Sequence, residues 1–286
     1  MRRLPIQSTM MEWLSGSGRP VAGRALFEVG TGHVPLAPIG FFLCGARSIM
    51  TVDLHRRIHW GLTRRSLEWI ADHRREVFAV YGHVTEKVLL GERFALLCSH
   101  RHDPAVFFAA AGIEYKAPFD AARTALPAGG MDGHFSINTL EHIPPLAVRS
   151  ILLEAKRILA PGGWIMHFAD LSDHFQHGDP SITKIHFLRF GEEEWQRIAG
   201  NEFAYCNRLR ASEYRRMFRE LGLAVEREEG IVDQACLAEA AAGRFFKANP
   251  RFSGLAPDDL CTVSLRILAR HDELAAVEGA KCSDHG

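Results

Sequence analysis

The sequence lacks an excess of charge of either sign. Its 286 residues contain 34 Lys and Arg and 34 Asp and Glu, and no long run of basic residues occurs. A dedicated nucleic-acid binder carries a basic patch or stripe. We therefore expect no nucleic acid among the partners.

Paired cysteines and long apolar runs are also missing. The six cysteines are scattered without a Cys-x-x-Cys pair, and no apolar stretch reaches the length of a membrane helix. Arg2 and Arg3 are not followed by the apolar stretch of an export signal. We expect reduced thiols, a cytoplasmic location and no membrane insertion. The hydrophobic content of 47% is ample for a core.

A nucleotide-binding pattern occupies residues 25–53. The apolar run Ala25 to Val29 predicts a strand, and Gly30 and Gly32 predict a tight turn into a helix. A second apolar run, Ser48 to Val52, ends in Asp53, at the distance where nucleotide folds place a carboxylate on ribose hydroxyls.

The residues around the glycines indicate which nucleotide fits. A dinucleotide fingerprint needs a third glycine where this chain has Pro35, and Glu28 would repel a pyrophosphate. A cationic ligand with a sulfonium and an ammonium beside an adenosine suits Glu28 and Asp53. S-adenosylmethionine (SAM) is such a ligand.

The run Glu28-Val29-Gly30-Thr31-Gly32 with Asp53 resembles motif I and the next acidic position of the class I SAM-dependent methyltransferases. The sequence departs from that pattern at Val34, where the family often has a third glycine. Asp120-Ala121, after a third predicted strand at Ile113 to Ala117, resembles the step that contacts adenine. The resemblance implies the following cofactor-binding residues: Glu28, Gly30, Thr31, Gly32, Asp53, Leu54, Asp120, Ala121, Asn138 and Thr139.

A second match lies between Met131 and Ile143, which resembles the fourth strand and the Leu-Glu-His-Ile exit of small-molecule methyltransferases. A helix, the turn Pro161-Gly162-Gly163 and a fifth strand follow in the family's order. There is no Asn-Pro-Pro-Tyr, Asp-Pro-Pro-Tyr or Pro-Cys motif, which argues against methylation of DNA bases.

The resemblance implies an α/β fold with a doubly wound, mostly parallel seven-stranded sheet and helical insertions. We predict a single domain over residues 1–286. Its predicted additions are an N-terminal extension at 1–24, a helical insertion at 56–112 with a helix at Thr63 to Tyr81, a cover on the acceptor side at 171–211, and a helical insertion at 231–259.

The cover at 171–211 follows the carboxyl end of a strand, where open α/β sheets build substrate sites. It is rich in His, Asp and Arg with aromatic residues between them. The polar candidates for contact with an acceptor are Asp173, His174, His177, His186, Asn207, Arg208 and Arg210.

Methyl transfer to a hydroxyl gains from a general base, and a pKa near neutral favours histidine. His142 is the first candidate because it leaves the fourth strand, and His174 and His177 from the cover come next. His142 could equally fix the turn between strand and helix.

We predict no metal ion. Some relatives with Glu-x-x-Glu-His at this place bind a divalent ion, but Asn138 replaces the first acid here. Glu141 and His142 remain, and His174 and His177 with Asp170 or Asp173 could complete a site. Solvated loop polarity explains these side chains more simply.

The sequence thus predicts a SAM-dependent methyltransferase that modifies an oxygen of a small molecule or saccharide, with a homodimer left open. The alternative is a methyltransferase-like protein that binds the cofactor without turnover and serves as a partner module.

Overall fold

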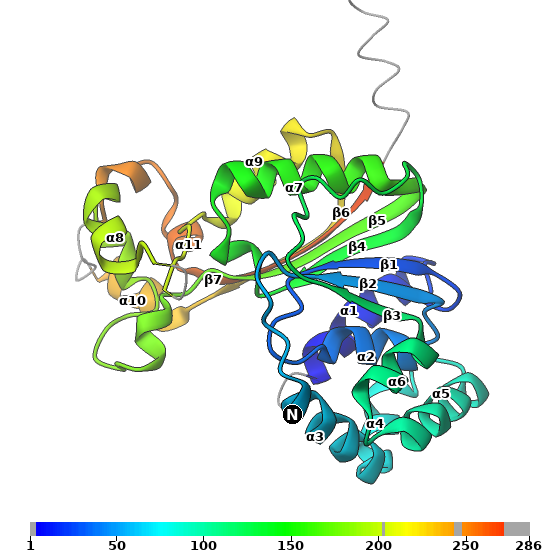
Figure 1. Cartoon of the computed structure of the whole chain (residues 1–286). Helices are drawn as coiled ribbons and strands as arrows, with labels where there is room; N and C mark the ends of the chain where they lie inside the picture. The colour runs from blue at the N-terminus through cyan, green and yellow to red at the C-terminus, as the bar shows by residue number, and fades with distance from the viewer. Residues whose placement is uncertain (1–3, 202–203, 243–247, 272–286) are drawn as a thin grey trace, which may run out of the picture. The chain divides into compact units, whose positions relative to one another are not determined.

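A computed structural model of the chain describes residues 4–201, 204–242 and 248–271. The described part contains a seven-stranded sheet in the order β3-β2-β1-β4-β5-β7-β6 (Figure 1). The strands are β1 Ala25–Val29, β2 Ser48–Val52, β3 Ile113–Lys116, β4 Met131–Ile137, β5 Leu159–Asp170, β6 Leu223–Val232 and β7 Thr262–His271. Strand β1 runs parallel to β2 and β4, β2 runs parallel to β3, and β6 and β7 are antiparallel. The predicted doubly wound, mostly parallel sheet is confirmed.

Among the described residues no helix has the length and apolar character needed to cross a membrane. The α-helices are α1 Leu4–Gly16, α2 Leu36–Leu43, α3 Trp60–Asp72, α4 Arg74–Tyr81, α5 Lys87–His100, α6 Pro104–Ala111, α7 Pro145–Ile158, α8 Glu192–Ala199, α9 Ala211–Glu220, α10 Gln234–Ala241 and α11 Pro257–Leu260. Four short 3-10 turns are η1 Leu140–His142, η2 His174–His177, η3 His186–Arg189 and η4 Pro250–Phe252.

The strand order reverses at β1, whose two neighbours are β2 and β4. Leu26 pairs with Ile49 on one side and with Gly133 on the other. Gly133 has to be a glycine, because a Cβ there would lie 2.2 Å from the indole ring of Trp164. Open α/β sheets bind ligands beyond the carboxyl ends of the strands at such a reversal.

The chain divides into two compact units, Met1–Phe135 with Glu154–Met166 and Ser136–Leu153 with His167–Gly286. In the first unit, helices α3 to α6 gather below strands β1 to β3 in the view of Figure 1. These helices occupy the segment 56–112. Helix α6 is capped at both ends: the Asp103 carboxylate accepts from the N–H groups of Ala105 and Val106, and Gly112 ends the helix at φ +67°.

The single helix predicted from Thr63 to Tyr81 is wrong. The structure has two helices, α3 and α4, with His73 between them in a non-helical conformation at φ −115° and ψ 46°. The His73 ring stacks on Trp69 at 4.0 Å, and its Nδ1 lies 2.8 Å from the Trp69 carbonyl oxygen. Local ring packing therefore divides a segment whose apolar spacing is continuous.

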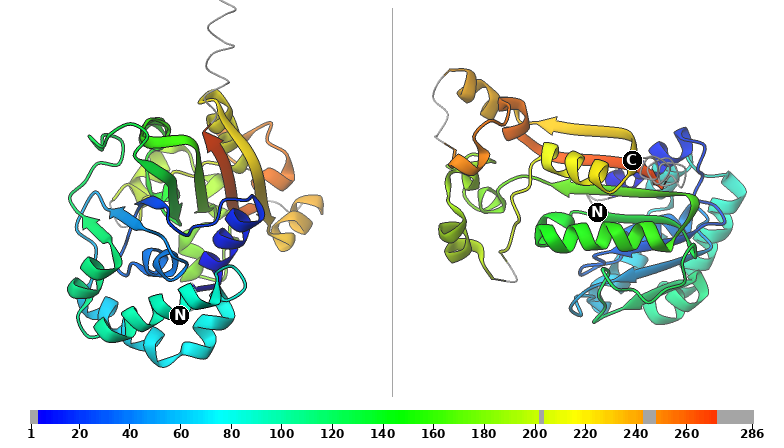
Figure 2. Two further views of the ribbon diagram at one scale, coloured as in Figure 1. Left: turned by 90° about the vertical axis from the view of Figure 1, so that its right-hand side faces the viewer. Right: turned by 90° about the horizontal axis from the view of Figure 1, so that it is seen from above.

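In the second unit, the long β6–β7 pair is flanked by α9, and α8, α10 and α11 gather near one end of β7 (Figures 1 and 2). A cluster of buried apolar side chains holds these short helices together; it includes Ile185, Phe187, Leu188, Trp195, Cys206, Cys236, Phe252 and Cys261. The inserted segments of this unit thus have a packed core.

Two predicted boundaries are wrong. Strand β6 continues to Val232, so the first residues of the predicted insertion 231–259 belong to the strand. Strand β5 begins at Leu159, and the predicted Pro161–Gly163 turn lies within it, with Gly162 at φ +74°. The single domain over residues 1–286 stays a prediction.

Candidate functional site

The turn after β1 is built by two glycines in the left-handed region. Gly30 has φ +86° and Gly32 has φ +67°, conformations that strain any residue with a side chain. The Gly30 N–H donates to the Val52 carbonyl oxygen at 2.8 Å, which joins the turn to the end of β2. The space above Gly32 is open. A ligand can therefore approach the backbone of this turn closely.

Asp53 lies beside this turn and is largely buried. Its Oδ1 accepts from the Gly32 N–H at 3.2 Å, and its Oδ2 accepts from the Tyr115 hydroxyl at 3.1 Å. Burial raises the pKa of Asp53 above its ordinary value, while these hydrogen bonds and the charge of Arg57 oppose the rise. The structure thus places Asp53 against the glycine turn, and Tyr115 is a partner that no sequence pattern indicated.

Glu28 lies beneath the turn and is only 3% exposed. The Thr51 hydroxyl donates to its carboxylate, and the hydroxyls of Thr51 and Thr31 lie 2.5 Å apart. Burial raises the pKa of Glu28 to about 8, and the nearby Asp53 adds to the rise. Without a ligand, Glu28 is therefore mostly protonated at neutral pH.

The loop after β3 approaches the same place. The Phe119 N–H donates to the Asp53 carbonyl oxygen at 2.9 Å, which fixes the adjoining Asp120 and Ala121 relative to Asp53. Asp120 is exposed, and its Oδ1 caps the loop by accepting from the Ala122 N–H at 2.9 Å. Leu54 is 61% exposed. The structure thus brings together Glu28, the glycine turn, Asp53, Leu54 and this loop within the first unit.

The predicted residues after β4 belong to the second unit. Asn138 has φ +50°, an uncommon conformation for a residue other than glycine, and its N–H donates to the Phe168 carbonyl oxygen at 2.7 Å. The Thr139 hydroxyl donates to the Ile137 carbonyl oxygen at 3.1 Å. Their roles in cofactor binding stay predictions.

Glu141, His142 and His174 form a cluster in the second unit. One carboxylate oxygen of Glu141 and one ring nitrogen of each histidine all lie within 4.8 Å of one another. The rings of His142 and His174 have centroids 5.0 Å apart, and His177 stacks on His174 at 5.5 Å. The structure therefore brings the three predicted catalytic histidines together, with Glu141 among them.

The ionisation of this cluster is shaped by burial. Burial raises the pKa of Glu141 to about 8, outweighing the nearby backbone N–H groups of Glu141 and Asp170. Burial also lowers the pKa of His174, although Asp170 opposes the change. At neutral pH, His174 is therefore a neutral imidazole that can accept a proton or a cation.

The comparisons with known proteins show the fold. No family profile matches the sequence, and no curated protein matches it. Among solved structures, geranyl diphosphate methyltransferase in complex with GPP and sinefungin matches over 92% of this chain and 78% of its own, at 12% identity and a TM-score of 0.51. The same enzyme is also solved in complex with SAM.

Two further structures match with similar coverage. A protein from Galdieria sulphuraria with the provisional name sarcosine dimethylglycine methyltransferase matches over 93% of this chain and 86% of its own, at 13% identity and a TM-score of 0.50. The cyclase SpnF matches over 93% of this chain and 80% of its own, at 14% identity and a TM-score of 0.47. This chain has the class I methyltransferase fold.

In this methyltransferase fold, the segment Asn207 to Arg210 supports the site instead of facing an acceptor. The side-chain Nδ2 of Asn207 donates to the carbonyl oxygens of Leu140 and Ile143, at 2.7 and 2.8 Å. The backbone N–H of Asn207 donates to the carbonyl oxygen of Glu141. These three bonds hold the turn that carries Glu141 and His142.

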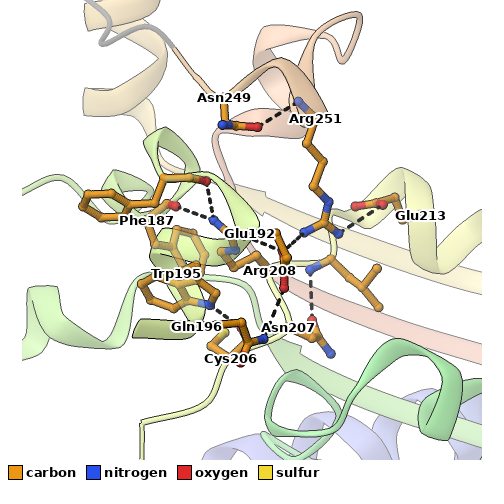
Figure 3. A network of polar contacts seen from close by, with 12 residues as sticks. Phe187, Glu192, Trp195, Gln196, Cys206, Asn207, Arg208, Glu213, Asn249 and Arg251 are labelled. Atoms are coloured by element: carbon orange, nitrogen blue, oxygen red, sulfur yellow. Dashed lines mark hydrogen bonds and ion pairs between the residues drawn. The ribbon is translucent and has the colours of Figure 1, made fainter. Parts of the chain in front are cut away.

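Arg208 is buried at the centre of a polar network (Figure 3). Its guanidinium donates to the carbonyl oxygens of Phe187 and Phe190 and to Glu192, and it lies over the Trp195 ring at 5.1 Å. Arg210 is also buried, and it donates to carbonyl oxygens that include those of Leu171 and Thr262. Neither arginine is available to an acceptor, so the prediction that Arg208 and Arg210 contact an acceptor is wrong.

Proposed function

We propose that the protein is a SAM-dependent methyltransferase acting on an oxygen of a small molecule or saccharide. The observation that carries this proposal is the meeting of two acids, Glu28 and Asp53, at a ligand-accessible glycine turn. Asp53 is joined to the turn by the bond from Gly32 at 3.2 Å, and Glu28 lies beneath it. A cationic nucleoside suits this pair, because its positive charge favours ionisation of the buried Glu28 carboxyl group beside Asp53.

Each acid has a separate role in this proposal. The Asp53 carboxylate would accept from the ribose hydroxyls in place of its present donors, Gly32 and Tyr115. The Glu28 carboxylate would balance the positive charge of the methionine end. The exposed side chain of Leu54 and the loop at Asp120 and Ala121 would border the adenine.

His142 has the protonation pattern that a general base needs. Its Nδ1 lies 2.9 Å from the Tyr205 carbonyl oxygen, which can only accept, so the proton must be on Nδ1. The lone pair is therefore on Nε2, and the ring is exposed. This imidazole can take a proton from an acceptor hydroxyl as the methyl group transfers.

Calorimetric titration with SAM and with NAD, followed by transfer of a labelled methyl group to hydroxyl-bearing acceptors, tests the proposal. We expect SAM to bind one site per chain, NAD to bind at least a hundredfold more weakly, and label to appear on an acceptor oxygen. Binding of SAM without transfer to any acceptor would favour the module that binds the cofactor without turnover. Failure to bind SAM would overturn both interpretations.

A further inference from the structure

We propose that Glu141, His142 and His174 form a binding site for a divalent transition-metal ion. One potential ligand atom from each lies within 4.8 Å of the other two, a separation that a shared ion can bridge after small side-chain movements. All three residues belong to the second unit, so the site does not depend on the cofactor residues of the first.

The buried carboxylate of Glu141 is the strongest indication. Glu141 is 1% exposed, and neither of its carboxylate oxygens has a hydrogen-bond partner of normal geometry among the described residues. A buried carboxyl group whose neighbouring N–H groups are poorly aligned is costly to ionise, and proteins relieve that cost by pairing it or by coordinating a metal ion. A bound cation would supply the missing partner for both oxygens.

The two histidines present nitrogen atoms that suit coordination. His142 uses Nδ1 to donate to the Tyr205 carbonyl oxygen at 2.9 Å, which leaves the Nε2 lone pair for a metal. Metal-ligating histidines typically donate their other ring nitrogen in this way. His174 has a buried Nε2 without a hydrogen-bond partner among the described residues.

The surroundings of the cluster hold it in place. The turn that carries Glu141 and His142 is fixed by the three bonds from Asn207. Asp170 Oδ2 lies 3.7 Å from His174 Nε2, while Asp170 Oδ1 accepts from the N–H and hydroxyl of Ser172. Asp170 is therefore oriented by one oxygen and can offer the other as a further ligand.

The donor set indicates the class of ion. One carboxylate and two imidazoles favour Zn²⁺, Mn²⁺ or Fe²⁺ over Mg²⁺ and Ca²⁺, which prefer oxygen ligands. Three protein ligands leave at least one coordination position open for water or another oxygen, as in catalytic sites. With a metal bound, the Nε2 lone pair of His142 would coordinate the ion, so His142 would not act as the general base.

Titration calorimetry with Zn²⁺ and with Mn²⁺ tests the site, on protein freed of metal by a chelator and carrying no polyhistidine tag. We expect one ion per chain in the wild type. Glu141→Gln and His174→Ala should each weaken binding by about a hundredfold or more, because each removes a ligand and even supporting residues contribute ten- to a hundredfold. Glu141→Gln preserves the size of the side chain, and its melting curve checks the fold.

His83→Ala is the matched control. His83 Nε2 lies 2.8 Å from Glu12, an exposed histidine–carboxylate pair in the other unit, and no described His, Cys, Asp or Glu joins the two in a three-residue ligand group. This variant should bind Zn²⁺ and Mn²⁺ as the wild type does. Absence of a stoichiometric site, or unchanged affinity in a folded Glu141→Gln or His174→Ala protein, would overturn the proposal. SAM binding measured on the same samples tests the proposed function separately.

Discussion

Binding of SAM should release a proton from Glu28. Burial raises the pKa of this carboxyl group to about 8, so at pH 7 about nine-tenths of the unliganded protein carries the proton. A cation placed beside Glu28 favours the ionised form and lowers its pKa. The proton therefore has to leave as the ligand enters.

The size of the effect follows from the pKa. Below pH 8 the affinity for SAM should rise about tenfold per pH unit, and above pH 8 it should level off. Between pH 6 and pH 9 the gain is about a hundredfold, or about 2.7 kcal/mol at 1.36 kcal/mol per pKa unit. Glu28→Gln, which is permanently neutral, should bind SAM about as well as the wild type at pH 6 and show no gain.

Titration calorimetry in two buffers of different ionisation enthalpy counts the released protons directly. Glu141→Gln is the matched control, because burial raises the pKa of that residue to about 8 as well and it belongs to the other unit. This control should keep the pH dependence that Glu28→Gln loses. A flat affinity profile in the wild type, or an equal slope in Glu28→Gln, would refute the assignment of Glu28 to the cationic end of the ligand.

Three further outcomes are expected. Asp53→Ala should weaken SAM binding at least tenfold by calorimetry, since hydrogen bonds to a carboxylate contribute about 1.5 to 3 kcal/mol each. Tyr115→Phe keeps that carboxylate, so its affinity for SAM should stay within a few-fold of the wild-type affinity. In protein freed of metal by a chelator, where Nε2 of His142 holds no ion, His142→Ala should keep cofactor affinity and lose about a hundredfold in turnover. This defect should shrink as pH rises, and full activity at neutral pH would remove His142 from the catalytic residues. Arg208→Ala should lower the free energy of unfolding by roughly 1 to 3 kcal/mol for each buried carbonyl that it leaves without a donor, which are those of Phe187 and Phe190. Glu192→Gln should lower it by less in the same denaturant melts, because Glu192 is 60% exposed and its replacement amide oxygen can still accept from Arg208; equal losses would contradict the burial argument.

The sequence was sufficient for the centre of the sheet. The first two strands begin and end where the apolar runs do, at Ala25–Val29 and Ser48–Val52, because parallel strands that are buried on both faces consist of continuous apolar residues. The positions of the glycine turn and of Asp53 were predictable from these same runs, because each lies directly after one of the two strands. Their contact was predictable because neighbouring parallel strands end at one edge of the sheet.

The surroundings of the site were less predictable. Tyr115 reaches Asp53 from a third strand, and the partners of Arg208 come from the separate segment 187–192. Charged side chains in a polar stretch usually face solvent, so the burial of Arg208 is visible only once the aromatic residues around it are placed. The burial of Glu141 was not predictable either. A single acid between Leu140 and His142 belongs to no periodic pattern that would indicate whether its side chain points to the core or to solvent.

The network of buried arginines also has a consequence for how the chain is made. Arg208 needs carbonyl groups about twenty residues earlier, whereas Arg210 needs the carbonyl of Thr262, 52 residues later in the sequence. If the segment around Arg210 folds before β7 has left the ribosome, the Arg210 guanidinium loses its hydrating water before the Thr262 carbonyl is there to replace it. We therefore expect the second unit to complete its structure only after β7 has left the ribosome, and a chain truncated before β7 to be open to proteases in this unit.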